Sequence, residues 1–265
     1  RFKNVHAATG QNKNQTFYFG GREVVIKAPD LSDVDINLDQ NTGLRFWDAS
    51  YLLAKYIESL DPPKPTSKKT RLKKHPFYNK TILELGSGTS GLLPLVALSY
   101  GAKCVIGTDI DSIALERLDM GVKWNLNRWD GFRDTEDVNS YWGVEELTWG
   151  VATSYERVLQ RLETMQHDTA ESNEAIVEKG FDVIIASEIL YLAGQHKNLA
   201  KTIRAFCHEE TRVYMVHKKR GLGEEGFYRM AKWAGLDCEE VPRELLDAEF
   251  VDDLDHVVLE MKLNE

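Results

Sequence analysis

The most constraining feature of this sequence is an apolar run that opens into a glycine-rich turn. Thr81 to Leu85 precede Gly86-Ser87-Gly88-Thr89-Ser90-Gly91, and a second apolar stretch follows the turn. This order predicts a buried strand, a tight turn and a helix. Gly86 and Gly88 have no side chain to obstruct a ligand on the turn, and Gly91 permits close packing at the helix start. The segment therefore predicts an open ligand-binding turn between a strand and a helix.

A second strand-like run places an acidic residue near this turn. Residues 104–108 precede Asp109, which lies about 20 residues after the glycines and can accept hydrogen bonds from two ribose hydroxyls. The two strands together predict a nucleoside-containing cofactor. Glu84 would repel a pyrophosphate but could hold the ammonium of S-adenosylmethionine, directly or through the loop. A nicotinamide dehydrogenase is therefore the least favoured interpretation.

The remaining sequence alternates between strand-like and helix-like segments, which is the rhythm of a parallel sheet. Apolar residues at helical spacing between Tyr155 and Met165 predict a further helix packed on the core, and residues 128–143 read as a loop. The last two strands predict a closing antiparallel hairpin. The expected strands are 81–85, 104–108, 144–148, 181–187, 212–217, 239–241 and 257–261, and the other expected helices are 92–100, 113–127, 197–206 and 225–234.

The residues before Lys80 predict an N-terminal appendage packed on the core. A hairpin is expected over 17–26 around Gly20 and Gly21, and a helix over 49–60 with Asp48 as its N-cap. A lysine-rich linker bounded by prolines follows. We assign residues 1–79 to this hairpin, helix and linker, and residues 80–265 to the cofactor-binding domain, the whole being effectively one domain.

The charge distribution argues against nucleic acid as a partner. The chain has 33 basic and 42 acidic residues, a formal charge of −9, whereas phosphate neutralisation requires a basic surface. The charges are polarised: six basic residues lie between Asp61 and Pro76, and nine acidic residues lie between Asp237 and Asp255. The functional interpretation of the second segment is an acidic rim that attracts a lysine-rich substrate, and the alternative is a solvated face.

Cysteine usage and hydropathy bear on the location of the protein. Cys104, Cys207 and Cys238 are widely spaced and predict reduced thiols. No apolar run approaches the roughly 20 residues that cross a bilayer. The histidines and cysteines show no metal-ligand spacing, so no metal is expected. These features predict a monomeric cytoplasmic protein with no membrane partner, with the nucleus as a second location.

Five motifs occur in an order that is similar to one enzyme family. The chain resembles the class I, seven-strand S-adenosylmethionine-dependent methyltransferases, and specifically the family 16 protein lysine methyltransferases of the methyltransferase-like 21 type. The motifs are Gly-Leu-x-Phe-Trp-Asp-Ala at 43–49, Leu-Glu-Leu-Gly-Ser-Gly-Thr at 83–89, Asp109, Trp149-Gly150, and Ala-Ser-Glu-Ile-Leu-Tyr at 186–191. The resemblance implies an α/β fold with a doubly wound, mostly parallel seven-stranded sheet and an antiparallel C-terminal hairpin.

The resemblance also assigns candidate site residues. Trp149 offers an adenine a flat apolar surface, and Glu188 and Tyr191 stand at the family's D-x-x-Y positions, beside the methyl-acceptor amine. The implied cofactor is S-adenosyl-L-methionine. The candidate cofactor-binding residues are Trp47, Glu84, Gly86, Ser87, Gly88, Asp109, Ile110, Trp149 and Ser187.

The acceptor is expected to be a lysine of a folded protein, by family analogy a translation factor, ribosomal protein or chaperone. This sequence has Glu188 where most lysine-modifying members carry Asp, and the related protein histidine methyltransferases show a similar Ser-Glu-x-x-Tyr pattern. A histidine acceptor is therefore the nearest alternative. A third interpretation is a cofactor-binding scaffold that does not transfer methyl groups.

Overall fold

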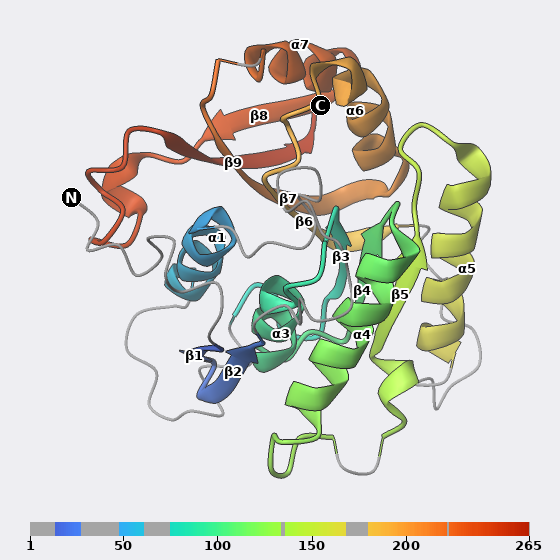
Figure 1. Cartoon of the computed structure of the whole chain (residues 1–265). Helices are drawn as coiled ribbons and strands as arrows, with labels where there is room; N and C mark the ends of the chain where they lie inside the picture. Colours follow the sequence, from blue (N-terminus) through green and yellow to red (C-terminus); the bar gives the residue numbers. More distant parts are fainter. Residues whose placement is uncertain are drawn as a thin grey trace, which may run out of the picture.

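The computed structural model describes residues 14–27, 48–60, 75–133, 136–167, 180–221 and 223–264 (Figure 1). At its centre is a seven-stranded sheet in the order β5-β4-β3-β6-β7-β9-β8. The strands β3 to β7 pair in parallel, and β9 runs antiparallel to both β7 and β8. The strands are β3 (Thr81–Leu85), β4 (Cys104–Asp109), β5 (Trp142–Glu146), β6 (Phe181–Ser187), β7 (Cys207–Lys218), β8 (Leu236–Glu240) and β9 (His256–Leu263).

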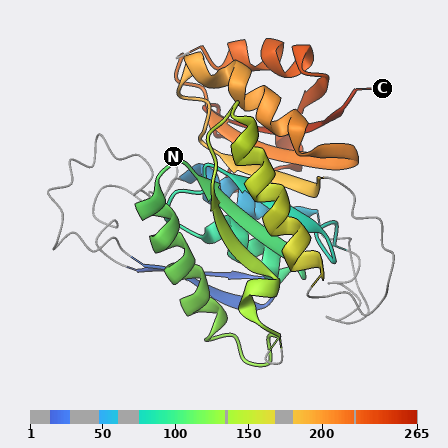
Figure 2. The ribbon, with the colours of Figure 1, turned by 90° about the vertical axis from the view of Figure 1, so that its right-hand side faces the viewer.

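The central strands are mostly apolar because helices cover both faces of the sheet. All five residues of β3 are buried. The helices α1, α3 and α4 lie over one face, and α5, α6 and α7 over the other (Figures 1 and 2). The helices are α1 (Asp48–Ser59), α3 (Leu92–Ser99), α4 (Ser112–Leu126), α5 (Ala152–His167), α6 (His196–Ala205) and α7 (Glu225–Trp233), and short 3-10 turns lie at η2 (Val138–Ser140), η3 (Ala193–Gln195) and η4 (Arg243–Leu245).

A two-stranded hairpin, β1 (Gln15–Phe19) and β2 (Arg22–Ile26), packs against α3 and α4. Asn125 of α4 fastens it, because its side chain accepts a hydrogen bond from the Val25 N–H at 2.8 Å and donates one to the Val25 carbonyl at 2.9 Å. The turn approaches α3 so closely that a Cβ on Gly20 would lie 2.4 Å from the Ser99 carbonyl oxygen. The hairpin is thus joined to the layer that covers the sheet.

The structure confirms the predicted α/β class with its mostly parallel seven-stranded sheet and antiparallel C-terminal strands, and it moves some boundaries. The strand expected over 144–148 is β5, which begins at Trp142 and ends at Glu146. Residues 128–143, expected as a loop, therefore contain η2 and the start of β5. The strand expected over 212–217 is twelve residues long, because it also pairs at Cys207 with Phe181. Asp48, expected as an N-cap, is the first residue of α1.

All three cysteines are free thiols, with Cys104 and Cys207 buried and Cys238 half-buried. Burial raises the pKa of the Cys104 thiol to about 12. In the described part of the chain, every helix is too short or too polar to cross a membrane.

Candidate cofactor and acceptor site

The candidate site lies where the strand order of the sheet reverses. β3 lies between β4 and β6. After β3 the chain crosses to β4 on one side, whereas after β6 it crosses to β7 on the other side, so the two connections leave the carboxyl ends of β3 and β6 in opposite directions. A crevice at such a switch point is the usual ligand site of an open α/β sheet. Leu85 pairs with Ala186, so the glycine turn after β3 and Ser187 at the end of β6 are neighbours. The topology therefore brings the two main sequence motifs together.

The glycine turn has no room for a side chain at Gly86. Gly86 and Gly88 have φ angles of 64° and 56°, which favour glycine. A Cβ on Gly86 would lie 2.6 Å from the Ile189 side chain and 3.7 Å from the Trp149 ring. Residues from three strand ends thus meet at this turn, as the sequence predicted for Gly86 and Trp149.

Glu84 is a buried carboxyl group inside the central strand. Its Oε2 atom has no hydrogen-bond partner among the described residues. Burial raises the pKa of Glu84 to about 8, the Asp109 charge adds to this effect, and a hydrogen bond from Ser87 opposes it. An ammonium ion placed against Oε2 would supply the missing partner and stabilise the ionised form. The group fits a ligand with an amino group.

Asp109 is the last residue of β4 and Ile110 follows it, at the same edge of the sheet. The Asp109 carboxylate accepts hydrogen bonds from the N–H of Gly88 at 2.9 Å, of Ile110 at 2.8 Å and of Asp111 at 3.1 Å. These contacts fix its position, and the carboxylate oxygens keep capacity for further donors such as ribose hydroxyls. The Ile110 side chain is 66% exposed, so it presents an apolar surface beside this carboxylate.

Two predicted cofactor residues, both serines, use their hydroxyls within the protein. The Ser87 hydroxyl accepts a hydrogen bond from the Thr108 N–H at 3.0 Å, and the Ser187 hydroxyl lies 3.0 Å from that of Ser50 in α1. Contact of Ser87 with a ligand would therefore involve its backbone. Trp149 is half-buried and lies three residues beyond β5. Trp47, the remaining predicted contact, lies outside the described residues.

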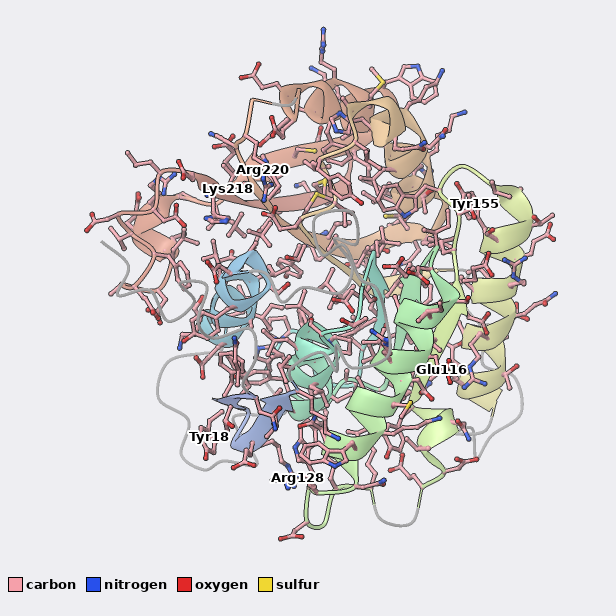
Figure 3. The ribbon with its side chains drawn as sticks, in the orientation of Figure 1. Tyr18, Glu116, Arg128, Tyr155, Lys218 and Arg220 are labelled. Atoms are coloured by element: carbon pink, nitrogen blue, oxygen red, sulfur yellow. The ribbon has the colours of Figure 1, made fainter. Side chains whose placement is uncertain are left out.

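Glu188 stands at the end of β6 with its side chain turned into the protein. Its φ angle of 58° is unusual for a residue with a side chain, and its N–H donates to the Val216 carbonyl. Its Oε2 atom forms a 2.5 Å ion pair with Arg220, whereas Oε1 has no hydrogen-bond partner among the described residues. Figure 3 labels Arg220 and its neighbour Lys218 near the end of β7. Tyr191, the second predicted acceptor residue, is 41% exposed.

Three charged residues beside Glu188 were not predicted from the sequence. Arg220 follows β7, whereas Asp253 and His256 lie at the start of β9. No local motif marks them: Arg220 lies near Glu188 through the parallel pairing of β6 with β7, and Asp253 and His256 come close through the antiparallel pairing of β9 with β7, in which Lys218 is opposite His256. Across the described ranges, no group of three or more His, Cys, Asp or Glu side chains is arranged to hold a metal ion.

Comparison with known proteins gives a consistent family. The model of a lysine methyltransferase family matches residues 30–234. A protein named protein N-terminal and lysine N-methyltransferase EFM7 from Yarrowia lipolytica is 27% identical over 175 residues, which cover 61% of this chain and 58% of the relative. The protein of the same name from Gibberella zeae is 26% identical over 182 residues, covering 63% of this chain and 61% of the relative. The matches thus span less than two thirds of these relatives.

Solved structures match in fold. A methyltransferase crystallised with S-adenosylhomocysteine superposes with a TM-score of 0.50 and 12% identity, covering 95% of this chain and 56% of the other. An S-adenosylmethionine-dependent methyltransferase from Streptococcus mutans gives the same TM-score, identity and coverage. At this identity the likeness concerns the Rossmann-like architecture alone.

Proposed function

This chain belongs to the lysine methyltransferase family, and from that premise we propose that it transfers a methyl group from S-adenosylmethionine to a lysine side chain of another protein. The observation that carries the proposal is the pair of incompletely partnered carboxylates at neighbouring strand ends. Glu84 lies beneath the glycine turn of β3, and Glu188 follows β6 next to it. One is suited to the amino group of a cofactor and the other to the amine of an acceptor.

The described residues fit this cofactor. Glu84 would hold the ammonium of its methionine part, Asp109 its ribose hydroxyls, and Trp149 and Ile110 the adenine. The backbone of Gly86 and Gly88, where the turn carries no side chains, would lie against the ligand. The bound cofactor supplies an electrophilic methyl group on a sulfonium, so the protein's main task is to position a neutral amine in line with it.

Glu188 and Tyr191 would act on the acceptor side. The Glu188 carboxylate can hydrogen-bond the incoming amine and offset its desolvation, and Tyr191 can line the entrance because its ring is partly exposed. The acidic segment from Asp237 to Asp255 ends next to this group. It supports a substrate whose target lysine lies in a basic surface, such as a translation factor, ribosomal protein or chaperone.

The first test is transfer of labelled methyl from S-adenosylmethionine into proteins of a cell extract. The unaltered chain is compared with Glu188→Gln and with Glu116→Gln, which changes an exposed glutamate on α4. We expect label in the unaltered chain and in Glu116→Gln, and its loss in Glu188→Gln with cofactor affinity retained. Mass spectrometry of the labelled peptide then identifies the acceptor.

The position of the label distinguishes the candidate functions. Label on lysine supports the proposal, whereas label on histidine selects the alternative suggested by the Ser-Glu-x-x-Tyr pattern. Label on an α-amino group would match the name of the two fungal relatives. Cofactor binding without any label would favour the scaffold interpretation.

A further inference from the structure

Four ionisable side chains from three segments lie near one another where β6 ends. Glu188 follows β6, Arg220 follows β7, and Asp253 and His256 come from the entry into β9. β9 runs antiparallel to the strands that carry the rest of the site, so its first residue lies at the edge where those strands end. His256 therefore reaches the acceptor side of the site although it lies 68 positions beyond Glu188 (256 − 188).

The imidazole of His256 is oriented by Asp253. Its Nδ1 atom lies 2.5 Å from Asp253 Oδ2, while Asp253 Oδ1 accepts from the N–H groups of Asp255 and His256. Burial alone would raise the pKa of Asp253. The hydrogen bond to His256, the charge of His256 and the hydrogen bonds from the two backbone N–H groups outweigh burial, so the pKa of Asp253 lies below its usual value. An ionised Asp253 holds the proton of the ring on Nδ1, which leaves Nε2 as the atom that faces Glu188.

His256 and Glu188 approach each other without a direct hydrogen bond. His256 Nε2 lies 4.0 Å from Glu188 Oε1, which is too long for a hydrogen bond. The residue Glu188 is only 8% exposed, and this oxygen has no hydrogen-bond partner among the described residues. A nitrogen about 2.9 Å from both atoms would satisfy each of them. The geometry suits an amine that donates to the carboxylate and gives a proton to the ring.

We propose that His256 is the catalytic base of the methyl transfer and that Asp253 is its positioning residue. The nitrogen of the substrate lies between His256 Nε2 and Glu188 Oε1. This proposal rests on the proposed function, which it deepens by naming the group that removes the proton.

The step balances as follows. The N–H bond of the substrate ammonium breaks, its electron pair stays on nitrogen, and the proton moves to His256 Nε2. Rotation about the carbon–nitrogen bond turns that lone pair toward the methyl group, where it forms the new N–C bond while the S–C bond of S-adenosylmethionine breaks and its electron pair stays on sulfur, so the positive charge passes from sulfur to nitrogen. The His256 ring is 13% exposed and can then release its proton to water.

Charged side chains of both signs surround His256. Asp253 and Glu188 face the ring with two carboxylates, and Arg220 offsets one of them through its ion pair. Lys218, opposite His256 in the sheet, is paired with Asp255 at 3.4 Å. The guanidinium of Arg243 donates to the backbone carbonyls of Asp253 and His256, and it fixes the segment that carries them.

The test is the rate of methyl labelling of an extract protein by His256→Ala across pH 7 to 10. We expect a loss of 100-fold or more at pH 7, the usual contribution of a general base. The loss should shrink toward pH 10, because lysine amines then lose their proton to water. The matched control is His208→Ala. His208 lies at the start of β7, at the opposite end of the strand from the site. Its rate should equal that of the unaltered chain.

Two further measurements separate proton transfer from a structural role. Imidazole in the buffer should raise the methylation rate of His256→Gly at least tenfold. Calorimetry should give the same S-adenosylhomocysteine affinity for that variant and the unaltered chain. Should His256→Ala fail to fold, His256→Gln serves in its place.

The proposal is overturned by full activity in the His256 variants, or by a loss that is independent of pH and insensitive to imidazole. Absence of label with the unaltered chain would overturn the proposed function, and this proposal with it.

Discussion

Glu84 and Glu188 are both buried glutamates, but their surroundings differ in charge. Glu188 is paired with Arg220, whereas among the described residues the charge that perturbs the pKa of Glu84 is the carboxylate of Asp109. Because an uncompensated buried carboxyl group prefers its neutral form, Glu84 is protonated in the cofactor-free protein up to about pH 8. A single residue can therefore couple folding, proton binding and ligand binding.

Glu84→Gln should change how stability depends on pH. In the unfolded chain Glu84 ionises near 4.5, and in the folded chain near 8, so the folded state holds the extra proton between these values. Its contribution to stability is therefore present at acid pH and is lost as pH rises through this window, by up to about 1.4 kcal/mol per pH unit. In urea unfolding without cofactor, the free energy of unfolding of Glu84→Gln relative to that of the unaltered chain should increase from pH 5.5 to pH 8.

The same variant should bind the cofactor more weakly, by about 1.5–3 kcal/mol, since a charge-assisted contact is lost. Glu116→Gln is the control for both measurements, because Glu116 is exposed on α4 (Figure 3). Parallel pH curves for Glu84→Gln and the unaltered chain would contradict the assignment of the shifted group.

Arg220→Met should destabilise the protein by leaving a buried carboxylate without its cation. The Arg220 side chain is 29% exposed and that of Glu188 5%, so we expect a loss of about 1–3 kcal/mol in the free energy of unfolding. The double variant Arg220→Met with Glu188→Gln should recover part of this loss, which a double-mutant cycle measures. Additive effects of the two changes would show that the ion pair carries no coupling energy.

The sequence predicted individual residues only where a local motif marks them. Glu84 and Asp109 were found because each stands at a fixed distance from the glycine turn, and the structure places both at the predicted edge. Asp253 and His256 were missed because their proximity to Glu188 depends on strand register, which no short pattern records. The structure gives the positions of these four side chains, and their chemical roles are predictions.

At the scale of elements, the N-terminal hairpin depends on a few side-chain anchors. Asn125 bonds both backbone groups of Val25, and Trp129 donates to the Glu23 carbonyl at 2.6 Å. Arg128 adds a 2.7 Å ion pair with Glu23 (Figure 3). α4 and the residues just after it therefore hold β2 through polar contacts as well as apolar packing.

Asn125→Ala should loosen this attachment. The change removes both hydrogen bonds to Val25 and buries an unpaired N–H and carbonyl, so we expect a loss of about 1–3 kcal/mol in the free energy of unfolding. Hydrogen exchange at Val25 should accelerate more than exchange in β3. Asn127→Ala, at an exposed position two residues on, is the matched control and should change little. Equal effects of both variants would argue against an anchoring role for Asn125.

Buried elements were predicted better than half-buried ones. The strands β3 and β6 matched the expected bounds because each is a continuous apolar run between turn residues. β5 was placed two residues late, because Trp142 is fully buried whereas its last three residues, Val144 to Glu146, are partly or fully exposed, so neither alternation nor an apolar run marks it. The extra length of β7 depends on pairing with Phe181, which sequence spacing does not reveal.

At the scale of the whole molecule, residues 237–255, which end close to the acceptor group, carry nine acidic residues and one arginine, a net charge of −8 in a chain whose total is −9. Within this segment Val251, Asp252, Leu254 and Asp255 are exposed, whereas Asp253 turns inward to His256. One loop thus presents acidic and apolar side chains to solvent while it contributes to the site. Under the proposed function, this loop would meet the substrate.

Asp252→Lys should raise the KM for a basic protein substrate several-fold at low salt, because an attractive charge becomes repulsive. The difference should shrink in 0.5 M NaCl, where the screening length is a few ångströms. Glu116→Lys makes the same charge change on α4 and should leave KM nearly unaltered. An equal effect of both variants would indicate a response to total charge rather than to the loop.

The positive φ angle of Glu188 should influence which substitutions are enriched when variants of this protein are selected. A side chain held at a φ of 58° costs of order 1 kcal/mol or more, and Glu84 adds the cost of an unsatisfied buried oxygen. Selection for heat resistance alone should therefore accumulate glycine or asparagine at position 188 and neutral residues at position 84. Selection that also demands activity should preserve both glutamates. The positions at which variants from the two selections differ would identify the residues that activity requires, without a direct assay of the reaction.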